Sequence, residues 1–297
     1  MPSKKDTVKR IVIFTVLAYL PVYIMGAVFL KGKGTEMEIT SATAGLLLMF
    51  FPTIANILTR VTTKEGFRNT YLGTGKKGSG KYYILPSVAI ILAGLAGGLL
   101  VGTFAQKDWS FSECVMSDGR IFTYGITSGI ISGIGIFASG FGEEFGWRAY
   151  LTPKLEELMS TPKAVIVTGI IWSFWHAPLI VRGYNFGVED RFFPYSSLLA
   201  MTVFCIAVAA ILTWLTKKTG SVYPAAVLHA VLDGINSIII GMIRYKDIQG
   251  EEIFENRYTD FITSCTFMLP TVIMGALFFV LLFQKKKLKF NDFFMIM

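Results

Sequence analysis

The chain is organised as long apolar runs separated by short polar loops. A transmembrane helix needs about 20 mostly apolar residues, because each residue rises about 1.5 Å along the helix axis. The number of runs near this length predicts an all-α, polytopic membrane protein of about eight transmembrane helices. The runs are Ile11–Leu30, Ala42–Leu58, Tyr82–Ala105, Ile121 to about Phe145, Ala164–Val181, Ser196–Leu215, Ser221–Met242 and Phe261–Phe283.

Between the runs, no segment is long enough to form a second domain. Residues 1–297 are therefore predicted to form a single membrane domain, with the polar motifs concentrated in residues 121–243. Tyr150–Met159 has the pattern of a short amphipathic helix at the membrane interface. Four prolines lie within the runs and predict kinks, because neighbouring helices can satisfy the carbonyl groups that a proline leaves free. They are Pro21, Pro52, Pro86 and Pro270.

Composition supports the membrane assignment. Hydrophobic residues make up 53% of the chain and charged residues only 16%, against roughly a quarter in typical soluble proteins. The net charge of +8 comes from Lys and Arg in loops that flank apolar runs, which favours contact with the lipid bilayer and argues against nucleic acid. The three cysteines show no CxxC spacing, so neither a disulfide framework nor a cysteine metal site is predicted.

The positions of the basic residues predict the orientation. With eight spans, both termini and three loops share one side, which carries 19 of the 28 Lys and Arg residues. The loops of the opposite side contain 12 of the 20 acidic residues. Since basic residues concentrate on the cytosolic side, both termini are predicted to be cytosolic, in what we expect to be a prokaryotic plasma membrane.

A few ionisable residues stand out because they lie in apolar runs, where charge is costly and suggests function. Glu143 and Glu144 are adjacent, so their side chains point about 100° apart and we expect them to differ in role. Arg148 follows Glu144 at i, i+4 spacing, which allows an ion pair. The chain has only two histidines, and both fall in apolar runs. They are His176 and His229, and the second has Asp233 at i, i+4.

Each feature alone has a structural explanation. A single buried histidine often makes only an interhelical hydrogen bond, and a pair of glutamates near a helix end can be an interfacial anchor. Trp172 fits an aromatic belt or core packing at least as well as a direct catalytic role. Together, two acids, two bases and an acid-paired arginine on three helices form a set that indicates chemistry.

These motifs resemble those of the CAAX prenyl endopeptidase and bacteriocin-processing family of intramembrane proteases. Glu143 to Arg148 reads Glu-Glu-x-x-x-Arg, Trp172 to His176 reads aromatic-x-x-x-His, and His229 to Asp233 reads His-x-x-x-Asp. The family pattern usually has Phe where this chain has Trp172, and it has Asn or Asp at the position of Asp233.

The resemblance implies a glutamate-dependent endopeptidase. Glu143 would activate the attacking water with help from His176, while His229 and Asp233 would face the carbonyl oxygen. Glu144 and Arg148 would orient these groups, with Trp172 in a supporting position, and water would enter through a polar cavity open to the cytosol. Zinc held by Glu143, His176 and His229 is one alternative and a metal-free mechanism the other, and the residues leave both open.

The substrate implied by the resemblance is a peptide or a prenylated protein, processed at a CAAX-type C-terminus, or a small peptide such as a bacteriocin in processing or immunity. A proton-coupled small-solute transporter would also use intramembrane Glu, His and Asp residues, but the chain shows no matching halves. A third alternative is a membrane scaffold without chemistry.

Overall fold

The computed structural model describes residues 3–28, 47–105, 137–249 and 261–283, and the regular elements in these residues are helices. Residues 137–146 form a further helical stretch that leads directly into η3. The elements are α1 (Lys4–Val28), α3 (Phe51–Thr62), α4 (Lys81–Leu100), η2 (Val101–Ala105), η3 (Trp147–Leu151), α7 (Thr152–Glu156), α8 (Thr161–Trp175), α9 (Ala177–Ile180), α10 (Tyr195–Thr219), α11 (Tyr223–Gln249) and α12 (Phe261–Phe283).

Four of the described helices are long and apolar enough to cross a membrane. They are α1, α4, α10 and α12, and each coincides with a predicted span. Proline lies inside three of them, at Pro21, Pro86 and Pro270, as the sequence indicated. The all-α, polytopic membrane fold is therefore confirmed. Of the other predicted spans, much of Ile121–Phe145 and part of Ala42–Leu58 lie outside the described residues.

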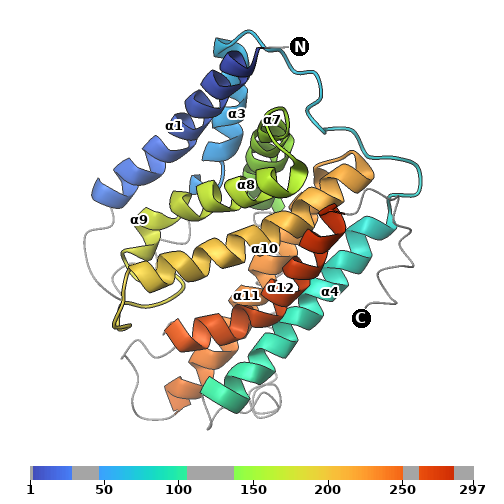
Figure 1. Ribbon diagram of the computed structural model, residues 1–297. Coiled ribbons are helices and arrows are strands. Elements are labelled where there is room, and N and C mark those ends of the chain that lie inside the picture. Colours follow the sequence, from blue (N-terminus) through green and yellow to red (C-terminus); the bar gives the residue numbers. More distant parts are fainter. Residues whose placement is uncertain (1–2, 29–46, 106–136, 250–260, 284–297) are drawn as a thin grey trace.

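The helices pack around α10 (Figure 1). α8 and α12 both lie along it, while α4 packs against α11 and α12, and α3 packs against α1. The middle of α10 is closely packed because its residues from Ala207 to Leu212 are all buried. This arrangement brings the segments that carry the motif residues into one bundle. These segments are residues 137–146, η3, α8 and α11.

Glycines let the motif-bearing helix approach its neighbours. A Cβ atom on Gly140 would lie 3.0 Å from the Ala226 carbonyl oxygen of α11, and one on Gly146 would lie 2.4 Å from the Pro52 Cβ of α3. Any larger side chain would push these helices apart. Residues 137–146 are thus held tightly between α3 and α11. This contact fixes the position of Glu143 and Glu144 relative to the two helices.

Two predicted helix boundaries and one predicted kink were wrong. The expected helix Ala164–Val181 breaks at His176, between α8 and α9, because Pro178 cannot donate the backbone hydrogen bond that a continuous helix needs. The expected interfacial helix Tyr150–Met159 is not separate, since η3 and α7 continue the helix that carries Glu143. Pro52 lies in the first turn of α3, where a missing N–H costs nothing, and so it does not kink a helix there.

Candidate active site

The site starts where the helix of residues 137–146 widens into the π-helical segment η3. π-Helical turns are rare and often occur at functional sites. Glu143 and Glu144 lie just before this segment and are almost fully buried, with 2% and 0% of their surfaces exposed. Burying two adjacent carboxylates is costly unless each has partners, so their contacts define the site.

Glu143 is held by two tryptophans. The indole Nε1 of Trp147 donates to Glu143 Oε2 at 2.9 Å, and Nε1 of Trp172 donates to the same oxygen at 2.6 Å. Trp147 is one turn along the same helix, whereas Trp172 comes from α8. One carboxylate oxygen is therefore fixed from two directions, and Oε1 is the oxygen that remains for another partner.

Glu144 has a different set of partners. Its Oε2 lies 3.1 Å from Arg148 Nε, which confirms the ion pair predicted from the i, i+4 spacing. Its Oε1 lies 2.8 Å from Nδ1 of His229 on α11. The two adjacent glutamates thus point to different groups, as the helical geometry predicts.

Arg148 is buried, with 1% of its surface exposed. Its guanidinium carbon lies 4.3 Å from the centroid of the Trp172 ring, a cation–π contact. Among the described residues, its Nη1 and Nη2 atoms have no hydrogen-bond partner. The charge of Arg148 is therefore balanced by Glu144 and by the face of Trp172, and both contacts matter more in a buried environment than they would in water.

His176 lies at the break between α8 and α9. Its Nδ1 is 3.0 Å from the Trp172 carbonyl oxygen, and because a carbonyl only accepts, Nδ1 carries the proton. In the neutral ring, Nε2 is then an acceptor that can hold a water. The ring packs edge-on against Trp175 and lies parallel to Tyr184, with centroids 4.8 Å and 6.5 Å away.

His229 contacts Glu144 and Trp172 on one side and Asp233 on the other. Its ring packs edge-on against Trp172 at 5.4 Å between centroids, and its Nε2 lies 3.6 Å from Asp233 Oδ2. Asp233 is the most open of the motif carboxylates, with 35% of its side chain exposed. The structure thus brings together all seven residues singled out in the sequence, in one network of contacts whose open side is at Asp233.

The metal alternative was tested against the side chains present. No three His, Cys, Asp or Glu side chains in the described part of the chain are grouped so as to hold a metal ion. Oε2 of Glu143 is taken by two indole N–H groups, and Nδ1 of His229 faces Glu144. In this arrangement, the side chains of Glu143, His176 and His229 are not grouped around a common metal position, and no step of the mechanism passes through a metal.

Two residues of the site were missed in the sequence. Trp147 could have been found from its i, i+4 spacing to Glu143, which resembles the Glu144–Arg148 spacing. Tyr184 gives no such signal, because it lies in the loop after α9 and reaches His176 only through the fold. Burial raises the pKa of the Tyr184 phenol well above its usual value, so the phenol stays protonated.

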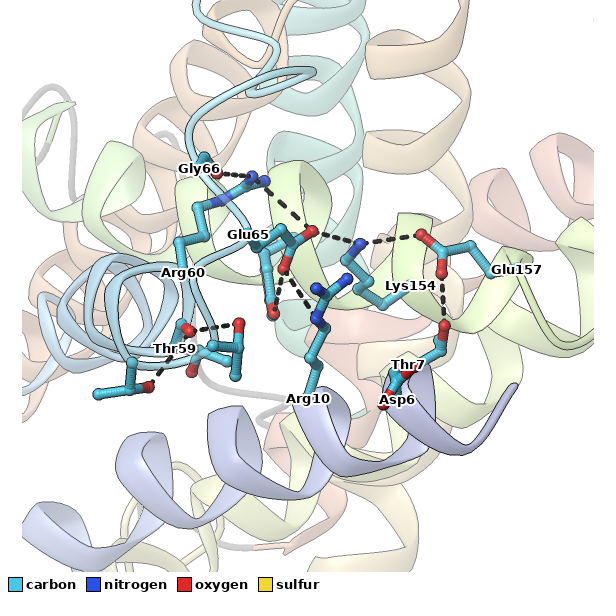
Figure 2. Close-up of polar contacts among 12 residues, drawn as sticks. Asp6, Thr7, Arg10, Thr59, Arg60, Glu65, Gly66, Lys154 and Glu157 are labelled. Atoms are coloured by element: carbon cyan, nitrogen blue, oxygen red, sulfur yellow. Dashed lines mark hydrogen bonds and ion pairs between the residues drawn. The ribbon is translucent and has the colours of Figure 1, made fainter. Parts of the chain in front are cut away.

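A second polar cluster lies beyond the far end of the motif helix, where α1, α3 and α7 meet (Figure 2). Glu65 forms ion pairs with Arg10, Arg60 and Lys154, and Lys154 also pairs with Glu157. A cavity of about 370 Å³ adjoins the cluster, and its lining includes Arg60 and Lys154 but none of the seven motif residues. This cavity is therefore not the one predicted to open at the motif residues.

The fold and the network define a helical membrane protein with a buried glutamate–histidine site. Residues 125–235, which include every motif residue, match the model of the family described as type II CAAX prenyl endopeptidase Rce1-like. The chain is also 28% identical over 102 residues to CAAX prenyl protease 2 of Methanococcus maripaludis. That match covers 34% of this chain and 37% of the relative's length. The resemblance seen in the motifs is thus confirmed for the middle of the chain.

Proposed function

We propose that the protein is an intramembrane endopeptidase in which Glu143 activates water. The observation that carries this proposal is the carboxylate of Glu143, buried in the bundle with one oxygen held by two indole N–H groups. A carboxylate fixed in this way is oriented for proton transfer, and its second oxygen can bind a water. The match to the protease family supports the same assignment.

In the first step, Glu143 Oε1 takes a proton from water while the water oxygen attacks the carbonyl carbon of the peptide bond. Nε2 of His176 accepts the second hydrogen of this water and holds it in place. The product of this step is a tetrahedral intermediate with a negatively charged oxygen. In the second step the C–N bond breaks, and Glu143 returns its proton to the leaving amine.

The negative oxygen of the intermediate needs hydrogen-bond donors. His229 and Asp233 lie side by side at the open edge of the network. They can donate to this oxygen when His229 carries a proton on Nε2 as well as on Nδ1 and Asp233 is protonated. Glu144 holds His229 through Nδ1 and also balances Arg148, so it supports the site without touching the substrate. Trp172 donates its N–H to Glu143, and its ring face contacts Arg148, the ion-pair partner of Glu144.

We propose a peptide or prenylated-protein substrate, cut near the boundary between membrane and cytosol. The name of the Methanococcus maripaludis relative, a CAAX prenyl protease, supports CAAX-type C-terminal processing. Processing of small peptides is the other substrate class within the same family. The site residues are the same for both, so the substrate has to be found by assay.

The test is cleavage of labelled peptides by protein purified in detergent, with prenylated and unprenylated CAAX peptides and a small-peptide library as substrates. Glu143→Gln keeps the size of the side chain but removes the base, so we expect hydrolysis to fall by ~10² or more with normal folded yield. Full hydrolysis by Glu143→Gln would sink the protease assignment. A proton flux in proteoliposomes that persists without any peptide cleavage would point to the transporter alternative.

A further inference from the structure

We infer that Trp147 and Trp172 are positioning residues whose indole N–H groups fix Glu143 Oε2 and so direct Oε1 toward the water. The inference rests on the proposed role of Glu143 as base. It gives a function to Trp172, which the sequence left as belt or packing, and to Trp147, which the sequence did not single out.

The two donors come from independent parts of the fold. Trp147 approaches Glu143 from the next turn of its own helix, and Trp172 approaches from α8. A single hydrogen bond would let the carboxylate rotate about that contact. Two N–H groups on one oxygen, from two directions, restrict that rotation and leave the other oxygen in a defined place.

The indole rings are themselves held in position. Trp147 is fully buried and packs edge-on against Phe14 and Trp175, with centroids 5.6 Å and 6.1 Å away. Trp172 contacts both the Arg148 guanidinium and the His229 ring. Because neither ring can turn without disturbing these contacts, the direction of each N–H is set by the core of the bundle.

A phenylalanine in place of Trp172 would differ from it in chemistry. A phenyl ring would keep the aromatic face that Arg148 contacts, but it has no N–H to donate. A Trp172→Phe substitution is therefore not conservative at this position. The Trp172 indole adds a hydrogen bond to the carboxylate, and a buried carboxylate gains much from each donor it accepts.

The bundle offers a matched control. Trp175 is one turn beyond Trp172 on α8, is equally buried, and donates its Nε1 hydrogen to the Ala18 carbonyl oxygen at 3.1 Å. A Trp-to-Phe change there removes an indole N–H of the same kind from the same helix, but not from Glu143. Any general cost of such a change is thus measured separately.

The experiment compares Trp147→Phe, Trp172→Phe and Trp175→Phe in peptide hydrolysis across pH 5 to 9. For the first two we expect kcat to fall by about 10- to 100-fold with KM nearly unchanged, the range for losing a hydrogen bond to a charged group. We also expect the acid limb of their pH–activity profile to lie at a higher pH than in wild type. Each variant has one hydrogen-bond donor fewer to favour the ionised form of Glu143. Trp175 also contacts the His176 ring, so Trp175→Phe measures the cost of a Trp-to-Phe change beside the site. Its kcat should fall less than in the other two variants, and its activity on the acid side should be lost at the wild-type pH.

Folding is checked by thermal unfolding in detergent and by the indole N–H resonances of ¹⁵N-labelled protein. The resonances of Trp147 and Trp172 should shift in Glu143→Ala, while that of Trp175 should not. Should a Trp-to-Phe variant fail to fold, these resonances still test the two hydrogen bonds.

The inference is overturned if Glu143→Gln is inactive while Trp147→Phe and Trp172→Phe match Trp175→Phe. If Glu143→Gln is itself active, the proposed function fails instead.

Discussion

Nδ1 of His229 lies 2.8 Å from Oε1 of Glu144, although the two residues are 85 positions apart in the chain. A carboxylate oxygen accepts, so this contact places a proton on Nδ1 and turns Nε2 toward Asp233. The same carboxylate pairs with Arg148 through its other oxygen. Glu144 therefore orders both a candidate catalytic histidine and a buried cation.

This double role predicts a large effect on stability. Glu144→Gln can still accept from His229, but it leaves the buried Arg148 without its counter-ion, and breaking a buried pair in this way costs about 3–5 kcal/mol. The double variant Glu144→Gln/Arg148→Met removes the unpaired charge as well, so thermal unfolding should show that it recovers much of the lost stability. Equal unfolding temperatures for Glu144→Gln and wild type would contradict the ion pair.

The motif residues show how far sequence reasoning can go. Residues at i, i+4, such as Glu144 and Arg148, could be paired correctly because helix geometry alone brings them together. The contacts from Trp172 to Glu143 and from His229 to Glu144 depend on how three helices pack, and no spacing within one helix encodes that. Tyr184 was missed for the same reason, since a loop residue has no periodicity to reveal which face it presents.

Tyr184 allows a prediction about the open side of the site. Its ring lies parallel to that of His176, and its loop is anchored where the Ser264 hydroxyl donates to the Asn185 carbonyl. We expect Tyr184→Ala to raise KM for peptide and lower kcat several-fold, since His176 loses the ring beside it, whereas Tyr184→Phe keeps the stacking and should retain most activity. Steady-state kinetics separates the two, and a Tyr184→Ala enzyme with wild-type constants would remove this residue from the site.

The polar cluster around Glu65 predicts a stability effect at the far end of the motif helix (Figure 2). Glu65 is mostly buried and pairs with three cations, while the Tyr150 hydroxyl donates to it at 3.1 Å. Glu65→Gln should therefore lower the free energy of unfolding by about 1–3 kcal/mol, because the cations lose their shared partner. Urea unfolding in detergent measures this, and a loss no larger than that of an exposed control such as Lys77→Gln would refute it.

Glu157, in the same cluster, predicts a pH dependence. Burial alone would raise the pKa of Glu157, but hydrogen bonds from Lys154 and Thr7 outweigh it and lower the pKa below its usual value of 4.5. A lowered pKa in the folded state means that this contribution to stability is present above about pH 4.5 and is lost as the pH falls further. The unfolding temperature of Glu157→Gln should thus lie below that of wild type at pH 7 and approach it as the pH falls below 4.5.

The charge distribution predicts the orientation, and two exposed positions, one in the last turn of α10 and one in the loop before it, allow a direct test. In a background without native cysteines, Lys217→Cys should be protected from an impermeant thiol reagent in intact cells, while Glu189→Cys should be labelled. Both positions are exposed, so differences in labelling report the side of the membrane rather than burial. Labelling of Lys217→Cys from outside would reverse the orientation and with it the expected cytosolic opening.

The last prediction concerns Asp233 and decides between the metal and metal-free mechanisms. As a hydrogen-bond donor to the negative oxygen of the intermediate, Asp233 must carry a proton, and an asparagine amide donates at every pH. Asp233→Asn should therefore preserve or raise activity near neutrality, and hydrolysis should resist chelators, because the described side chains do not group around a metal. If Asp233 instead orients a metal ligand, the substitution should weaken metal binding and activity by ~10- to 100-fold. Activity across pH 5 to 9 and the metal content of the purified protein are measured together, since a stoichiometric metal that is lost in Asp233→Asn would overturn the metal-free mechanism.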